Sequence, residues 1–196
     1  MYRLTPRMLQ HLTTSLGKYH DLFMGGRCSG WELEELIVAA IKSDTQAQHQ
    51  VRWKEGGHDA EADITVKVNG NTHFLQIKSG KTARQYITLS GHRLGRYKGN
   101  LNAITEYLNE PKADMVSAPC RKDDGERGRQ YVYSICYIDA AQLAGVKAAD
   151  WVKHGAIYRQ TNRHGVEFSL RPTMSWQIWW KIPLSITEQT DEIVIG

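Results

Sequence analysis

Two short segments of this chain carry the polar residues best suited to chemistry. Residues 62–68 alternate polar with apolar side chains, which is the period-two pattern of a half-buried strand. Residues 72–78 predict a second strand, and the Asn69-Gly70 pair between the two segments is typical of a two-residue hairpin turn. The sequence therefore predicts an antiparallel hairpin.

This hairpin brings three polar side chains onto one face. If Asn69-Gly70 forms the turn, Asp63 lies directly opposite Gln76. Lys78 follows two residues later, so its side chain emerges on the same face as Gln76. The other face is apolar and consists of Ile64, Val66, Leu75 and Ile77.

A carboxylate close to an amide oxygen can bind a hard divalent cation such as Mg²⁺, which prefers oxygen ligands and retains several waters. The candidate metal ligands are Asp63, Gln76 and the backbone carbonyl of Ile77. Lys78 could orient or help deprotonate an attacking water, while the metal polarises a phosphate. We therefore expect a Mg²⁺-dependent hydrolytic site.

The sequence from Gly57 to Ile64 (GHDAEADI), followed by Leu75 to Lys78 (LQIK), resembles the catalytic hairpin of the PD-(D/E)XK nuclease superfamily. It is most similar to the Gln-x-Lys variants, which include Mrr-type restriction endonucleases. The resemblance implies a central mixed sheet flanked by helices, a DNA substrate and a Mg²⁺ cofactor. It also implies catalytic roles for Asp63, Gln76 and Lys78.

The resemblance extends to an upstream helix and covers roughly residues 29–81. It maps Glu34 onto the glutamate with which that helix often joins the catalytic site, with Glu35 as the alternative. Ala62 occupies the position of the proline in the motif, and Gln76 stands where a carboxylate is more common. The missing charge lowers the expected metal affinity unless Glu34, Asp59 or the substrate phosphate contributes.

A basic stretch follows the hairpin. Between Asp63 and Glu106 the chain has no acidic residue, so the cations there have few acidic partners nearby in sequence. Such a stretch can follow a phosphate backbone, although a solvated basic surface without a ligand would look the same. The candidate DNA-binding residues are Lys81, Arg84, His92, Arg93, Arg96 and Lys98. Base-reading candidates also include the segments 121–129 and 159–164.

The remaining pattern predicts one α/β domain over residues 1–196, with a restriction endonuclease-like central mixed sheet flanked by helices. Helices are predicted over 5–23, 29–43, 101–108 and 140–143, the second capped by Ser29. Further strands are predicted over 131–138, 156–160, 166–170 and 176–182, with polar loops over 44–50 and 121–129.

Composition excludes several other classes of protein. The chain has no apolar segment long enough for a membrane span or a signal peptide, so we expect a cytoplasmic protein. Its three cysteines are far apart and predict no disulfide framework. Nucleotide-binding glycine loops and nucleophile elbows are also absent from the sequence.

These observations lead to a functional hypothesis with two alternatives. The sequence predicts a type II restriction-like endonuclease that cuts double-stranded DNA at a specific site with Mg²⁺, as a homodimer matched to palindromic DNA. A structure-selective nuclease of the Holliday-junction type would use the same hairpin. A catalytically inactive DNA-binding module with a nuclease fold would also share it, and Gln76 is the residue that permits this alternative.

Overall fold

The computed structural model describes residues 1–23, 26–44, 50–53, 62–125 and 128–196. Its α-helices are α1 (Pro6–Leu22), α2 (Trp31–Ser43) and α3 (Leu101–Asn109), close to the predicted ranges. Thr5 caps α1 by accepting a hydrogen bond from the backbone N–H of Met8. The Ser29 cap is wrong, because Gly30 occupies the N-cap of α2 with a φ of 65° and no side chain caps this helix.

A mixed six-stranded sheet, here called the mixed sheet, has the order β1-β2-β3-β6-β9-β14. Its strands are β1 (Gln50–Trp53), β2 (Ile64–Val68), β3 (Asn71–Lys78), β6 (Asp114–Ser117), β9 (Cys136–Ile138) and β14 (Glu188–Gln189). Strand β3 pairs antiparallel with β2 and parallel with β6. The predicted α/β class with a mixed sheet is therefore confirmed, although β1, β6 and β14 were not predicted.

A second six-stranded sheet, here called the antiparallel sheet, has the order β10-β11-β12-β13-β5-β4. Its strands are β4 (Lys81–Ala83), β5 (Tyr86–Arg93), β10 (Val152–His154), β11 (Ile157–Thr161), β12 (Glu167–Arg171) and β13 (Gln177–Pro183). Most of the basic stretch is therefore strand. The strands predicted over 156–160, 166–170 and 176–182 correspond to β11, β12 and β13. They join the basic stretch because β13 pairs with β5.

The small third sheet has the order β15-β8-β7. Its strands are β7 (Cys120–Gly125), β8 (Gly128–Tyr133) and β15 (Ile193–Ile195). The predicted loop over 121–129 is wrong for the described residues, because residues 121–125 lie in β7 and residues 128–129 lie in β8, and these two strands pair antiparallel. Short 3₁₀ helices cover Gly95–Tyr97, Ala140–Leu143, Ala148–Asp150, Pro172–Met174 and Leu184–Ile186.

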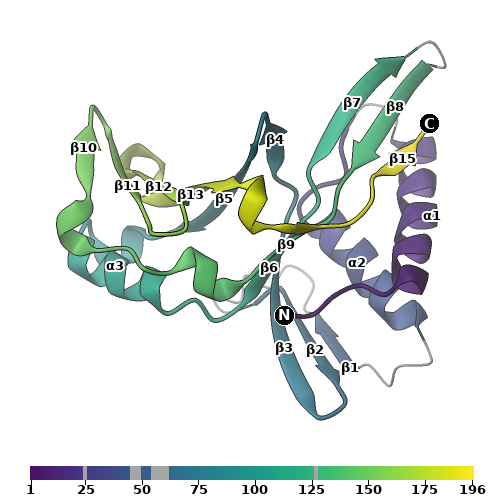
Figure 1. Cartoon of the computed structure of the whole chain (residues 1–196), viewed down its shortest axis with the longest axis horizontal. Coiled ribbons are helices and arrows are strands. Elements are labelled where there is room, and N and C mark those ends of the chain that lie inside the picture. Colours follow the sequence, from purple (N-terminus) through teal and green to yellow (C-terminus); the bar gives the residue numbers. More distant parts are fainter. Residues whose placement is uncertain (24–25, 45–49, 54–61, 126–127) are drawn as a thin grey trace.

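The chain buries two hydrophobic clusters, one on each side of the molecule (Figure 1). Helices α1 and α2 lie side by side and pack against the mixed sheet through residues such as Leu12, Ile37 and Leu75. Helix α3 covers one face of the antiparallel sheet, where Ile104 packs in the same cluster as Phe168. The central sheet of the prediction is thus accompanied by a second sheet with a core of its own.

Candidate active site between the two sheets

The hairpin forms with the predicted turn. Val68 pairs with Asn71, and Ile64 pairs with Leu75. Asn69 and Gly70 have φ values of 48° and 78°, the left-handed conformation that a type I′ turn requires at both positions. The register inferred from Asn69-Gly70 therefore holds along β2.

The ladder changes at Asp63, just before β2 begins. The Asp63 N–H donates to the carbonyl of Leu75 rather than continuing the pairing with Gln76. The Asp63 Oδ2 atom accepts a hydrogen bond of 2.8 Å from the backbone N–H of Ile77. Because β2 ends at Ile64, the Asp63 carboxylate occupies the place of a strand partner and reaches past Gln76 along β3.

Lys78 completes this arrangement. Its Nζ atom donates to Asp63 Oδ2 at 3.1 Å and to the backbone carbonyl of Ile77 at 3.0 Å. The side chains of Asp63 and Lys78 are only 14% and 19% exposed, so water screens their ion pair weakly. Asp63 and the Ile77 carbonyl, two of the three predicted metal ligands, therefore both accept hydrogen bonds from the Lys78 ammonium group.

Gln76 lies on the same face of β3 as Lys78 but has a different partner. Its Nε2 atom lies 2.8 Å from Nε2 of His92 in β5. The amide donates this hydrogen bond when the ring nitrogen is unprotonated, which leaves the amide oxygen as the atom that could bind a cation. The contact joins the mixed sheet to the antiparallel sheet.

A cleft of about 790 Å³ opens beside the Asp63–Lys78 pair. It is lined by the start of α2, the end of β3 and the end of β5. Glu34 faces this cleft and accepts a hydrogen bond of 3.3 Å from Nε1 of Trp53, whereas its alternative Glu35 is exposed on α2. The structure thus brings Glu34 to the same cleft as Asp63.

The predicted DNA-binding residues divide into two groups. His92, Arg93 and Arg96 line the cleft. Lys81, Arg84 and Lys98 are exposed on the surface outside the lining that the structure describes. The Arg96 guanidinium lies over the rings of Tyr97 and Tyr107, at 4.9 and 5.0 Å from their centroids, and is thereby held at the rim of the cleft.

A smaller pocket of about 350 Å³ adjoins the cleft and includes Gln76 in its lining. His92, Arg96 and Tyr107 line both cavities. Asp63 and Lys78 therefore face the larger cavity and Gln76 faces the smaller one, with His92 at their boundary.

The donors at this site suit a hard cation. A carboxylate from Asp63, a carboxylate from Glu34 and the carbonyl of Ile77 are all oxygen ligands, as Mg²⁺ prefers. Among the described residues no three His, Cys, Asp or Glu side chains cluster closely enough to hold a metal by themselves. Mg²⁺ would therefore depend on backbone, amide, water and phosphate oxygens as well. Asp59 lies outside the described residues.

Sequence reasoning did not identify several residues of the cleft. Tyr107 arrives from α3 and Gln177 from β13, far from the hairpin in sequence. Gln177 pairs with Arg93 across a bulge in the contact between β13 and β5. The pairing of β13 with β5 places Gln177 at the cleft, and no local sequence pattern predicts that pairing.

Comparison of the chain with protein-family models, with curated proteins and with solved structures found no match. Within the described part of the chain, no helix has the length and apolar character needed to cross a membrane.

Proposed function

We propose that this chain is a Mg²⁺-dependent endonuclease that hydrolyses phosphodiester bonds of double-stranded DNA. The observation that carries the proposal is the Lys78 ammonium group held between the Asp63 carboxylate and the Ile77 carbonyl, inside a cleft with Arg93 and Arg96 at its edge. Oxygen ligands for a cation, a positioned lysine and a phosphate-attracting rim are three components that support such hydrolysis.

The residues have distinct roles in this proposal. Asp63 and the Ile77 carbonyl would hold Mg²⁺, with Gln76 and Glu34 as further oxygen donors. When bound, the metal supplies Lewis acidity at the scissile phosphate. Lys78 orients the attacking water through its ammonium group and balances the charge of Asp63. Attack of that water on phosphorus forms one P–O bond and breaks another, which leaves a phosphate and a free hydroxyl at the cut.

Restriction-type specificity and a homodimer belong to the same proposal. They rest on the resemblance of the hairpin to Mrr-type restriction endonucleases and on symmetry. Two copies related by a two-fold axis would present two clefts to a palindromic site and cut both strands.

One observation favours the inactive alternative. The Gln76 amide is already engaged by His92, and glutamine supplies no charge to the metal. A chain with this site could retain DNA binding and lack the reaction. Cleavage and binding therefore have to be measured separately.

The proposal is tested with supercoiled plasmid and a synthetic four-way junction, each incubated with the purified chain in Mg²⁺ or in EDTA. We expect discrete linear plasmid products in Mg²⁺ only. Cleavage of the junction alone would favour a structure-selective nuclease. DNA that is retarded on a gel but never cut would favour the binding module.

A further inference from the structure

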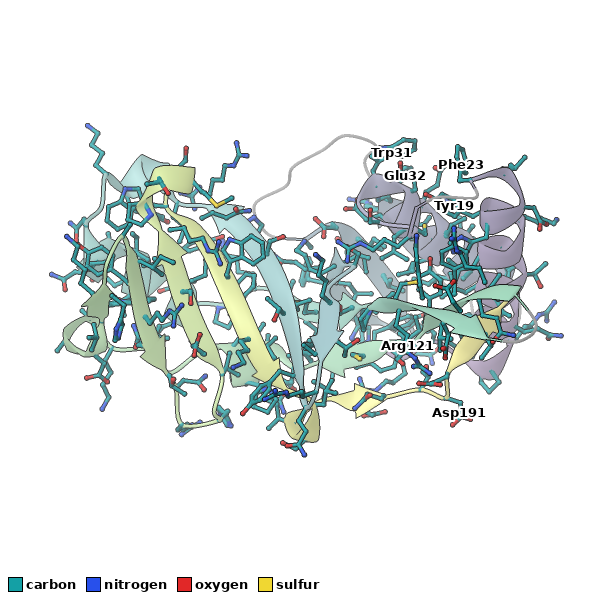
Figure 2. All side chains as sticks on the ribbon, turned by 90° about the horizontal axis from the view of Figure 1, so that it is seen from above. Tyr19, Phe23, Trp31, Glu32, Arg121 and Asp191 are labelled. Atoms are coloured by element: carbon teal, nitrogen blue, oxygen red, sulfur yellow. The ribbon has the colours of Figure 1, made fainter. Side chains whose placement is uncertain are left out.

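The antiparallel sheet has one face that no α-helix of the described residues covers. Figure 2 looks down on this face and shows its strands side by side, whereas α3 packs on the opposite face. Strand alternation sends Phe168, Leu170 and Trp180 toward α3 and their neighbours toward the open side. No α-helix of the described residues therefore packs on these outward-facing side chains.

Cations dominate the open face. The ladder aligns Arg159, Ser169, Trp179 and Ser90 in one row across four strands. The next row aligns Glu167, Lys181, Thr88 and Lys81, and another aligns Arg171, Gln177 and Arg93. The described strands thus place five cations on this face, Lys81, Arg93, Arg159, Arg171 and Lys181, against the single carboxylate of Glu167. Within the described residues, none of the five has a carboxylate partner within ion-pair distance.

The aromatic rings on this face are covered by cations. The Arg171 guanidinium lies over Trp179 at 4.6 Å from its ring centroid, and the Lys181 ammonium lies over Tyr86 at 4.3 Å. Surfaces that bind single strands offer open aromatic rings on which bases stack. Here cations lie over the rings and face outward, and such charges attract the phosphates of a nucleic-acid backbone.

The open face also leads into the candidate active site. Ser90, Arg93 and Gln177 belong both to the rows described above and to the lining of the cleft. A phosphate backbone lying on the strands would therefore continue toward Asp63 and Lys78 without crossing an acidic surface of the described sheet.

We propose that the open face of the antiparallel sheet is the docking surface for the backbone of double-stranded DNA. This inference rests on the proposed function and extends it to the C-terminal strands β11, β12 and β13. The contacts are electrostatic and independent of base sequence, so the surface holds the duplex while residues at the cleft act on it.

The test is a binding titration of a fluorescent duplex in EDTA, where no cleavage occurs, at several salt concentrations. The variant Arg159→Glu/Lys181→Glu changes two exposed residues of the face. The matched control, Arg7→Glu/Lys18→Glu, changes two exposed cations of α1 at the other end of the molecule and alters net charge equally. A milder pair, Arg159→Gln/Lys181→Gln, and a thermal melt of each variant guard against misfolding.

We expect the Glu pair on the face to weaken duplex binding at least tenfold more than the control pair does. The slope of log affinity against log salt should become less steep by about 2, since each lost phosphate contact removes about 0.9. Equal affinities for the face and control variants would overturn the proposal, as would tighter binding of a single strand of the same length. Wild-type binding without cleavage in Mg²⁺ would refute the endonuclease and leave the docking surface intact.

Discussion

The ammonium group of Lys78 is the centre of the proposed chemistry at the scale of single residues. It contacts both Asp63 and the Ile77 carbonyl, which are candidate ligands of the metal. The lysine balances the charge of the half-buried Asp63 carboxylate. In the proposed mechanism the same ammonium group orients the attacking water.

Replacing either member of the Asp63–Lys78 pair should abolish turnover and spare binding. Lys78→Ala and Asp63→Asn are each expected to reduce cleavage at least 10²-fold, the usual scale for a lost catalytic proton-transfer or charge-stabilising group. Duplex affinity in EDTA should remain within a few-fold of wild type, because the docking cations are elsewhere. Glu35→Ala, on the exposed side of α2, is the control. If Lys78→Ala cuts at the wild-type rate, the assigned role of Lys78 is wrong.

Gln76 gives a prediction in the opposite direction. Gln76→Glu adds a carboxylate beside the metal ligands, and a carboxylate binds Mg²⁺ more tightly than an amide oxygen does. We expect cleavage to reach half its maximal rate at a lower Mg²⁺ concentration than in wild type. A Mg²⁺ titration of the cleavage rate measures this shift. A higher Mg²⁺ requirement in the variant would show that Gln76 does not act on the metal side of the site.

At the scale of elements, the pairing of β5 with β13 positions the cleft residues Ser90, Arg93 and Gln177. Gly91 lies in β5 where a Cβ atom would approach the Trp180 ring to 2.2 Å. Because a side chain at position 91 would clash with Trp180, this position requires glycine. His92, which holds Gln76, is the next residue in the chain.

Gly91→Ala is expected to destabilise the fold by about 1–3 kcal/mol, the usual cost of overpacking a core. Gly17→Ala in the interior of α1 is the matched substitution, because a Cβ there meets nothing within 4 Å. It should stabilise the fold by about 0.5–1 kcal/mol through helix propensity. Urea unfolding of both variants measures the difference. Equal stabilities would mean that β5 and Trp180 are packed more loosely than described.

The hairpin could be predicted from sequence because its signals are local. Period-two alternation and the Asn69-Gly70 turn determine which residues of β2 and β3 face one another. The end of that ladder could not be predicted in the same way. It depends on the Asp63 side chain replacing a strand partner of Ile77, which is a choice between competing hydrogen bonds.

The antiparallel sheet was predicted only in part, because strands β11, β12 and β13 were expected from the sequence whereas β4, β5 and β10 were not. Strands β4 and β5 lie in the stretch whose basic residues were interpreted as a DNA-binding surface. Strand β13, which pairs with β5, is far away in sequence. The helices α1 and α3 were predicted well because their apolar residues recur at helical spacing within one segment. The mixed α/β class followed from local patterns, whereas the second core depends on long-range pairing.

At the scale of the whole molecule, two cores joined through β3, β5 and β6 hold the site at their boundary. One buried group links the stability of the core beside α1 to pH. His20 is 7% exposed, its Nε2 lies 2.7 Å from the Tyr133 hydroxyl, and its ring stacks on Tyr131. Burial, aided by the charge of Lys122, lowers the pKa of His20 below its ordinary value of 6.5.

This lowered pKa predicts a loss of stability in mild acid. Below pH 6.5 the unfolded chain takes up a proton on His20 that the folded chain resists, so the free energy of unfolding falls as pH falls. Above pH 6.5 the contribution is fully present. Thermal melts from pH 8 to pH 5 should show a steeper decline for wild type than for His20→Gln. Identical slopes in the two proteins would contradict this assignment.

The most direct test of the central claim is the rate at which the purified wild-type chain cuts supercoiled plasmid as Mg²⁺ is raised from zero. Asp63→Asn, purified in the same way, serves as the control for contaminating nucleases. The proposed site predicts cleavage that requires Mg²⁺ in wild type and is lost in the variant. A wild-type chain that leaves the plasmid intact at every Mg²⁺ concentration, or a variant that cuts equally well, would contradict it.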